Sequence, residues 1–465
     1  MHLDPLFLSR LQFAWVVAWH FLLPAFTIGL ASYIAVLEGM HLITGRDIYF
    51  RISTFWIKIF AVSFGMGVVS GITMPFQFGT NWSRYSDKIA DVLSPLLAYE
   101  GLTAFFLEAA FLGVLLFGRN LVPRWAHFFA ALMVAIGTLF STFWILAVNS
   151  WMQTPAGYTL VDGRFQPANW IEIIFNPSFP YRFAHTVTAV YITTAFVVVG
   201  VGAFYLLRQR FHEEARLMMS MGLWLLTILV PAQAFIGDQH GINTLEHQPA
   251  KLAAMEAIWN TGRRLPWVVF AIPDDAAAKN LDEVSIPDLG SLILTHSVDG
   301  EVKGLKDFPP QDRPPVAIPF FGFRIMIALW GVMALSVLAS LWLRFRGALY
   351  DSDWYLRFCT IIAPIGFLTV IAGWATTEVG RQPWTVYGQL RTADSVTPSI
   401  TGFDVLLSFV GYSIVYLLMF AAGIALILRI VRKGPVEAAR EDEEIEAGRP
   451  RQPATALPHA EGGRG

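Results

Sequence analysis

Long apolar runs separated by short polar stretches dominate this chain of 465 residues. A helix needs roughly 20 apolar residues to cross the ~30 Å hydrocarbon core of a bilayer. Nine runs reach or approach that length: 11–37, 50–78, 94–117, 125–152, 180–207, 218–235, 319–343, 358–377 and 403–430. A backbone in lipid must satisfy its own hydrogen bonds, which a helix does within one segment. The pattern therefore predicts an all-α, polytopic integral membrane protein with about nine transmembrane helices.

Two polar segments lie outside these runs. The segment 236–318 is rich in Asp, Glu and Pro and contains one predicted helix, 251–260. The segment 434–465 is charged and poor in aromatic residues, a composition typical of disorder. We therefore expect four parts: helices 1–6 in 1–235, a large extracytoplasmic loop in 236–318, helices 7–9 in 319–433, and a disordered cytoplasmic tail in 434–465.

Composition supports the membrane assignment, because 55% of the residues are hydrophobic and only 15% are charged. The single cysteine, Cys359, excludes an internal disulfide and a covalent CxxCH haem attachment. The first apolar run is too long for the core of a signal peptide, so it is predicted to be a retained helix. We expect no nucleic-acid partner.

The orientation follows from the Arg and Lys residues of the short connections. The connections after helices 1, 3, 5 and 7 and the segment after helix 9 carry most of them: Arg46, Arg51, Arg119, Arg124, Arg208, Arg210, Arg216, Arg344, Arg346, Arg357, Arg429, Arg432 and Lys433. Positive residues favour the cytoplasmic side. The C-terminus is therefore predicted to be cytoplasmic and the N-terminus outside.

Several residues within the spans are chemically unusual for a bilayer, where an ionisable group costs ~2.5–3.5 kcal/mol on insertion scales. On the predicted topology, five reactive side chains from different parts of the chain fall in the outer half: His20, Glu100, His185, Met326 and Glu378. Glu108 lies ~12 Å deeper than Glu100 on the same helix. This convergence predicts one polar region large enough for a cofactor.

The residue types indicate haem. A His and a Met from facing helices can supply both axial ligands of a low-spin haem. A single His or a carboxylate opposite an open position leaves the iron free to bind oxygen. Arg381 follows Glu378 by three residues, where it can hold an anionic ligand or a haem propionate. Trp374, one turn before Glu378, can pack on a porphyrin face.

Other interpretations of the same residues remain open. A histidine in a membrane helix can serve only interhelical hydrogen bonding, and a methionine can be packing. Glu378 and Arg381 can form an interfacial ion pair beside belt tryptophans. The main alternative function is a proton- or cation-coupled transporter that uses the intramembrane carboxylates and histidines. A structural membrane subunit, or a di-haem cytochrome without oxygen chemistry, is a further alternative.

The order of several motifs resembles a known family over nearly the whole hydrophobic chain. The motifs are SRLQFA with His20, LLAYEGLTAFFLEAAFLG, FAHTVTAVY, GDQHG, KLAAMEAIW, FRIMIAL and GWATTEVGRQPW. Together they resemble subunit I of cytochrome bd-type quinol oxidases. The outer loop lacks the long insertion of some members and is similar to the short-loop, cyanide-insensitive branch.

The resemblance implies the haem ligands. His185 and Met326 match the axial ligands of haem b558, with Arg324 beside it. His20 matches the ligand of one high-spin haem and Glu378 that of the other, while Glu100 matches a further haem-site glutamate. These two haems are b595 and d, and the resemblance leaves open which residue holds which. In the short-loop branch a b-type haem can replace haem d.

The resemblance also implies an activity and partners. Lys251 and Glu256 match the quinol-site pair, Glu108 the carboxylate of the proton route, and Trp374 and Arg381 the residues that flank the glutamate ligand. Quinol would be oxidised at the outer face of the bacterial inner membrane, and oxygen reduced to water with cytoplasmic protons, which generates proton motive force without pumping. The expected partners are subunit II, a small single-helix subunit and membrane lipid.

Overall fold

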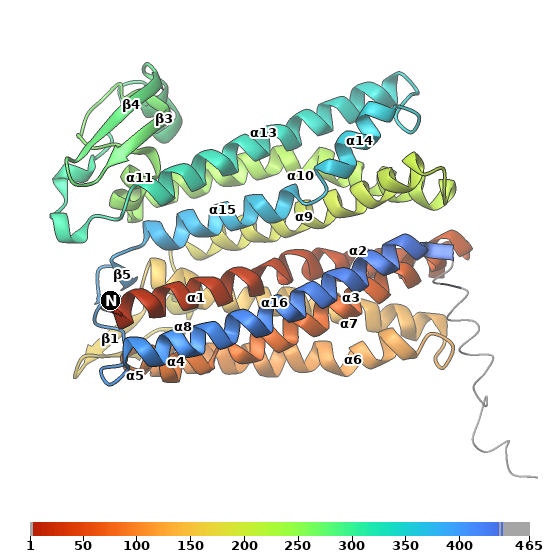
Figure 1. The fold of residues 1–465 in the computed structure, drawn as a ribbon, viewed down its shortest axis with the longest axis horizontal. Helices are drawn as coiled ribbons and strands as arrows, with labels where there is room; N and C mark the ends of the chain where they lie inside the picture. The colour runs from red at the N-terminus through yellow and green to blue at the C-terminus, as the bar shows by residue number, and fades with distance from the viewer. Residues whose placement is uncertain (1–2, 437–438, 440–465) are drawn as a thin grey trace, which may run out of the picture.

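The computed structural model describes residues 3–436 and 439. Within this described part, nine helical segments are long and apolar enough to cross a membrane, which confirms the predicted number. Figure 1 shows these helices side by side along the long axis of the molecule. The fold is therefore an all-α membrane bundle, as the hydropathy pattern predicts.

The nine spans contain one or more helices each. Three spans come first: α1 (Pro5–Leu22) with α2 (Pro24–Thr44); α3 (Asp47–Thr73) with α4 (Phe76–Thr80); and α5 (Ser83–Tyr99), η1 (Glu100–Phe105) and α6 (Phe106–Phe117). Six more follow: α7 (Arg124–Gln153), α9 (Phe179–Leu207), α10 (His212–His247), α13 (Ala317–Phe345), α14 (Asp353–Ile361) with α15 (Ile365–Gly380), and α16 (Gly402–Lys433). The breaks before α2 and α15 lie at Pro24 and Pro364, because proline has no N–H to donate within a helix.

Three antiparallel hairpins lie at one end of the bundle. They are β1 (Tyr158–Val161) with β2 (Arg164–Pro167), β3 (Trp267–Asp274) with β4 (Lys279–Ile286), and β5 (Trp384–Val386) with β6 (Leu390–Arg391). In Figure 1 they lie at the end that also holds the start of α1. We call this the hairpin end, and the opposite end, where α16 finishes at Lys433, the tail end.

Short helices complete the connections at the hairpin end. They are α8 (Trp170–Ile174), α11 (Pro249–Glu256), α12 (Leu289–Thr295), η2 (Leu305–Asp307) and η3 (Pro310–Asp312). The helix predicted at 251–260 is α11, shifted toward the N-terminus. Beyond α16 the predicted disordered tail falls almost wholly on residues 437–438 and 440–465, which lie outside the described residues.

All nine spans of the described part are longer than their apolar runs, and two of them are much longer. The third begins at Ser83 rather than 94, because α5 is amphipathic: Tyr85, Ile89 and Val92 are buried while polar residues between them face outward. The sixth continues to His247, so the first twelve residues of the expected loop 236–318 are helical. An apolar window stops where the residues of a helix become more polar, although the helix itself goes on.

Candidate functional site

Glu378 lies at the hairpin end, two residues before the end of α15, within a ring of hydrogen-bond donors. Arg381 Nη2 donates to Glu378 Oε2 at 2.6 Å, and Asn149 Nδ2 of α7 donates to Oε1 at 2.9 Å. The two charged side chains are only 17% and 10% exposed. Because a surface ion pair would be open to water, this burial argues against a simple interfacial pair.

A hydrogen-bond chain connects Glu378 to the segment after α10. Lys251 Nζ of α11 donates to Gln153 Oε1 at 2.6 Å and to Gln248 Oε1 at 3.0 Å. Gln153 Nε2 in turn donates to Glu378 Oε1 at 3.4 Å. Lys251 is almost completely buried. Gln153, at the end of α7, therefore links Lys251, a predicted quinol-site residue, to Glu378, a predicted ligand of haem iron.

Arg182 of α9 adds a further cation to this region. It is buried, its Nε has no partner among the described residues, and its charge acts on both Glu378 and Lys251. Burial, and then the charge of Arg182, hold the pKa of Lys251 well below its ordinary value. Even with a neutral Lys251, the guanidinium groups of Arg182 and Arg381 face one carboxylate.

The excess of positive charge around Glu378 indicates whether a haem fits this site. Buried charge without a partner is strongly unfavourable, and Arg381 Nε also lacks a partner among the described residues. The cluster therefore fits an additional anionic group. The propionates of a haem have the required charge, and arginine pairs with carboxylates through two parallel hydrogen bonds.

His185 and Met326 approach the same end from different helices. His185 lies ~9 Å of rise from the start of α9, and Met326 ~13 Å from the start of α13. The imidazole Nδ1 of His185 is buried without a partner among the described residues. Met326 Sδ lies against α15, since a Cβ added at Gly373 would come within 3.0 Å of it. Both side chains are at a depth where they can serve one cofactor.

Arg324 and Glu256 form a separate buried pair. Arg324 Nη2 donates to Glu256 Oε2 at 2.6 Å, and Arg324 Nε donates to the Val268 carbonyl of β3 at 2.8 Å. Positions five apart on a helix point about 140° apart, so Glu256 and Lys251 leave α11 on different faces. The structure thus does not bring the predicted quinol pair together: Glu256 secures the outer segment to α13.

His20 occupies a different part of the bundle. Its Nδ1 lies 2.9 Å from Ser70 Oγ, whose own hydrogen is directed at the Met66 carbonyl. With the Ser70 hydroxyl donating to a backbone carbonyl, its oxygen can accept from Nδ1–H, and His20 Nε2 is then the nitrogen with a free lone pair, as a metal ligand requires. His20 lies ~22 Å from the start of α1, farther along the helix than the apolar run 11–37 implies, because α1 begins at Pro5.

Glu100 and Glu108 lie near and beyond the middle of the third span. Glu100 begins the π-helical segment η1. Residues eight apart in an α-helix point about 80° apart, and one inserted residue turns the later one back by about 100°. The π-helical segment therefore turns both carboxylates toward α7, where they meet two residues that are one turn apart on α7. Ser141 donates to Glu100 Oε1 at 2.8 Å, and Glu108 packs on Gly137.

The predicted residues thus fall into several groups rather than one. Glu378, Arg381, Lys251 and His185 share the hairpin-end charge cluster, whereas His20, the Glu100–Glu108 pair and the Arg324–Glu256 pair are separate from it. Trp374 lies half-buried one turn before Glu378, as predicted. No three His, Cys, Asp or Glu residues of the described chain could hold a bare metal ion. A haem needs only axial ligands from the protein, so this finding is compatible with haem.

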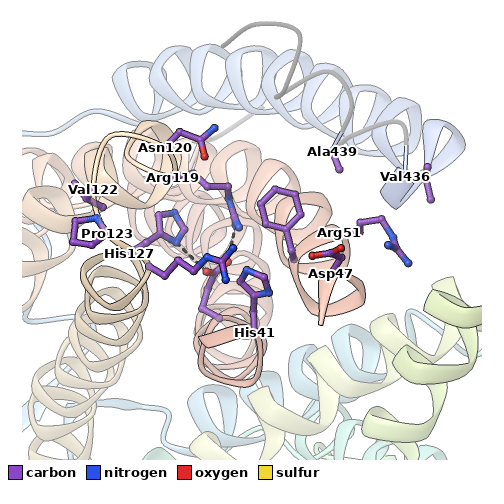
Figure 2. Close-up of a pocket in the computed structure, with 13 residues that line it drawn as sticks. His41, Asp47, Arg51, Arg119, Asn120, Val122, Pro123, His127, Val436 and Ala439 are labelled. Carbon is purple, nitrogen blue, oxygen red and sulfur yellow. Dashed lines mark hydrogen bonds and ion pairs between the residues drawn. The ribbon is translucent and has the colours of Figure 1, made fainter. Parts of the chain in front are cut away.

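A recess of about 660 Å³ lies at the tail end, beside Val436 (Figure 2). At its base, Arg119 Nη2 and His127 Nδ1 contact the two oxygens of Glu38 at 2.6 and 3.0 Å. On its wall, Arg51 Nε pairs with Glu214 at 2.7 Å. These charges compensate one another, and the recess is at the opposite end of the bundle from Glu378.

Sequence reasoning missed several polar residues of both ends. They are Glu38, His127, Asn149, Gln153, Arg182, Gln233 and His240. Arg182, in FPYRFAH, interrupts an apolar run with a charge and could have been noticed by the same rule that selected Glu108, whereas Asn149, in ILAVNSWMQ, is neutral and could not. Their partners come from other helices, however, so only the fold shows what they contact.

Comparison with known proteins places the chain in a family. A cytochrome bd ubiquinol oxidase subunit 1 of Bacillus subtilis is 36% identical over 93% of this chain and 94% of its own length. A cytochrome bd-II ubiquinol oxidase subunit 1 of Escherichia coli is 31% identical over 96% and 100%. The structure of bd oxidase from Geobacillus thermodenitrificans matches with a TM-score of 0.85 and 28% identity, covering 93% of this chain and 99% of that chain. Residues 8–435 match the model of the cytochrome bd terminal oxidase subunit I family, and the chain belongs to this family.

Proposed function

We propose that this chain is the haem-bearing subunit of a terminal quinol oxidase, which oxidises quinol and reduces oxygen to water together with subunit II. The family assignment supports the activity, and the unbalanced cations around Glu378 support a bound anionic cofactor. A transporter that used the same carboxylates would leave Arg182 and Arg381 without a second anion. The oxidase therefore explains more of the site than the transporter does.

The proposed haem contacts follow the groups described above. His185 and Met326 hold the low-spin haem b558, with Arg324 near it. His20 Nε2 and Glu378 would hold the two high-spin haems, b595 and d, with Glu100 and Trp374 as further haem-site residues. A b-type haem in place of d is compatible with the short loop. The haems supply the redox and oxygen chemistry, and the protein supplies ligands, distances and proton access.

Quinol oxidation is assigned to the hairpin end, which the positive-inside rule places outside the cytoplasm. A lysine with a lowered pKa is neutral above that pKa and can accept a proton from a quinol hydroxyl. Burial also raises the pKa of Glu256, against the opposing effect of Arg324. Lys251 is thus the proton acceptor of the proposed quinol site, and Glu256 acts by holding the outer segment in place.

Proton supply is assigned to Glu108, which lies closer to the tail end than Glu100. If protons enter from the cytoplasmic side, water formation near the hairpin end separates charge without a pump. Moving one charge across 100 mV stores ~2.3 kcal/mol. On this proposal the chain lies in the bacterial inner membrane, with its N-terminus outside and its C-terminus in the cytoplasm. A small single-helix subunit completes the complex.

Substituting Lys251 with methionine tests the quinol site. We expect quinol-driven oxygen consumption to fall by about 100-fold, while dithionite still reduces all haems. Wild-type activity should decline as pH falls through the lowered pKa of Lys251, because the protonated amine can no longer accept a proton. Exposed Lys303 offers a matched control, K303M. Normal turnover of K251M with quinol would remove Lys251 from the site.

A further inference from the structure

One face of α10 packs against His185, the residue proposed to hold the low-spin haem. Gln233, Gly237 and His240 are spaced by four and three residues and so share this face. A Cβ added at Gly237 would lie 3.5 Å from His185 Cε1, and the His240 ring centroid is 5.5 Å from that of His185. The family resemblance assigned no role to Gln233.

Two buried polar atoms on this face are complementary and unused. Gln233 Nε2 already donates to the backbone carbonyl of His185 at 3.2 Å. On the same amide, Gln233 Oε1 is buried without a donor, and His185 Nδ1 is buried without a partner among the described residues. Buried polar groups are normally hydrogen-bonded, so each such orphan needs an explanation.

The ligand role of His185 supplies that explanation. An imidazole that binds metal through Nε2 carries its proton on Nδ1 and usually donates it to a nearby acceptor, which fixes the ring and increases its basicity. Gln233 Oε1 is an acceptor on a side chain already attached to the same residue. His240 is the other candidate, and its ring meets the His185 ring at 61°, edge to face. Gln233 is favoured because its amide already bonds the backbone of His185 and carries the unpartnered acceptor.

We propose that Gln233 is a positioning residue for the low-spin haem: its Oε1 accepts the Nδ1–H of His185 when Nε2 binds iron. This inference rests on the proposed function, because it requires His185 to be a haem ligand. The hydrogen bond makes the imidazole a stronger donor of electron density, which favours the ferric state. The amide of Gln233 therefore lowers the reduction potential of this haem and holds the ligand ring in one orientation.

A redox titration of the purified complex tests the proposal. Gln233→Met keeps the approximate shape of the side chain and removes the acceptor. We expect it to retain the low-spin haem, to shift its midpoint potential to a more positive value, and to change the g-values of its ferric EPR signal. Gln233→Glu keeps an acceptor oxygen, and its midpoint should lie below that of Gln233→Met. His240→Phe retains an aromatic ring and should leave the potential close to that of the wild type.

The outcomes separate this inference from the proposed function. A wild-type complex without a low-spin haem would end the proposed function itself. A normal wild-type signal with unchanged potential and g-values in Gln233→Met would overturn only the role of Gln233. The same holds if His240→Phe alone reproduces the positive shift, because His240 would then be the acceptor.

Discussion

Replacing His185 with alanine removes the low-spin haem signal from the reduced-minus-oxidised spectrum of the complex. The alanine cannot bind iron, and the neighbouring His240 lies on the same side of the site, against the His185 ring rather than in its place. Met326→Leu should also abolish the low-spin signal, since leucine fills the same volume against α15 without a sulfur ligand. Difference spectroscopy of membranes measures both.

The exposed histidine His212, at the start of α10 and the tail end, provides the control for this experiment. His212→Ala should retain a wild-type spectrum. An unchanged low-spin signal in His185→Ala would refute the ligand assignment, whatever the activity of the variant.

Glu108→Gln should reduce oxygen consumption by about 100-fold or more, the typical contribution of a positioned proton donor. Glutamine preserves the packing of this buried side chain on Gly137 but cannot carry a proton. The haem spectra should be unchanged, because Glu108 is not proposed to bind iron. An oxygen electrode with excess quinol measures the loss.

The exposed Glu213 gives a matched control, Glu213→Gln. Gly137→Ala is a second test, because its Cβ would come within 2.6 Å of Glu108 Cγ and displace the carboxylate. Oxygen consumption at the wild-type rate in Glu108→Gln would exclude Glu108 from the proton route.

Hydropathy predicts the number of spans well because a bilayer demands apolar helices of fixed length. It predicts helix ends poorly, since α5 is amphipathic and the end of α10 is polar, and both helices continue beyond the apolar window. The distances of His20 and Glu100 from the starts of their helices are consequently greater than the apolar runs imply. The π-helical segment at Glu100 has no signature in the sequence, because the inserted residue is accommodated by packing against α7.

The site residues illustrate the same limit. Lone charges in apolar runs, such as Glu378 and Glu108, stand out because their burial is costly. Neutral polar residues do not stand out in this way. Gln153, at the end of α7, has the sequence context of an interfacial residue, yet it links Lys251 to Glu378 by hydrogen bonds. The separation of Lys251 from Glu256, by contrast, follows from helical periodicity alone and could have been predicted.

The haem content of the purified wild-type complex is the most direct test of whether this chain is the haem-bearing subunit of a quinol oxidase. A pyridine haemochromogen assay combined with a reduced-minus-oxidised spectrum counts the haems and identifies their types. We expect three haems per copy of this chain: one low-spin b-type haem, one high-spin b-type haem, and one high-spin haem of type d or b. A correctly assembled complex without haem absorption would contradict it.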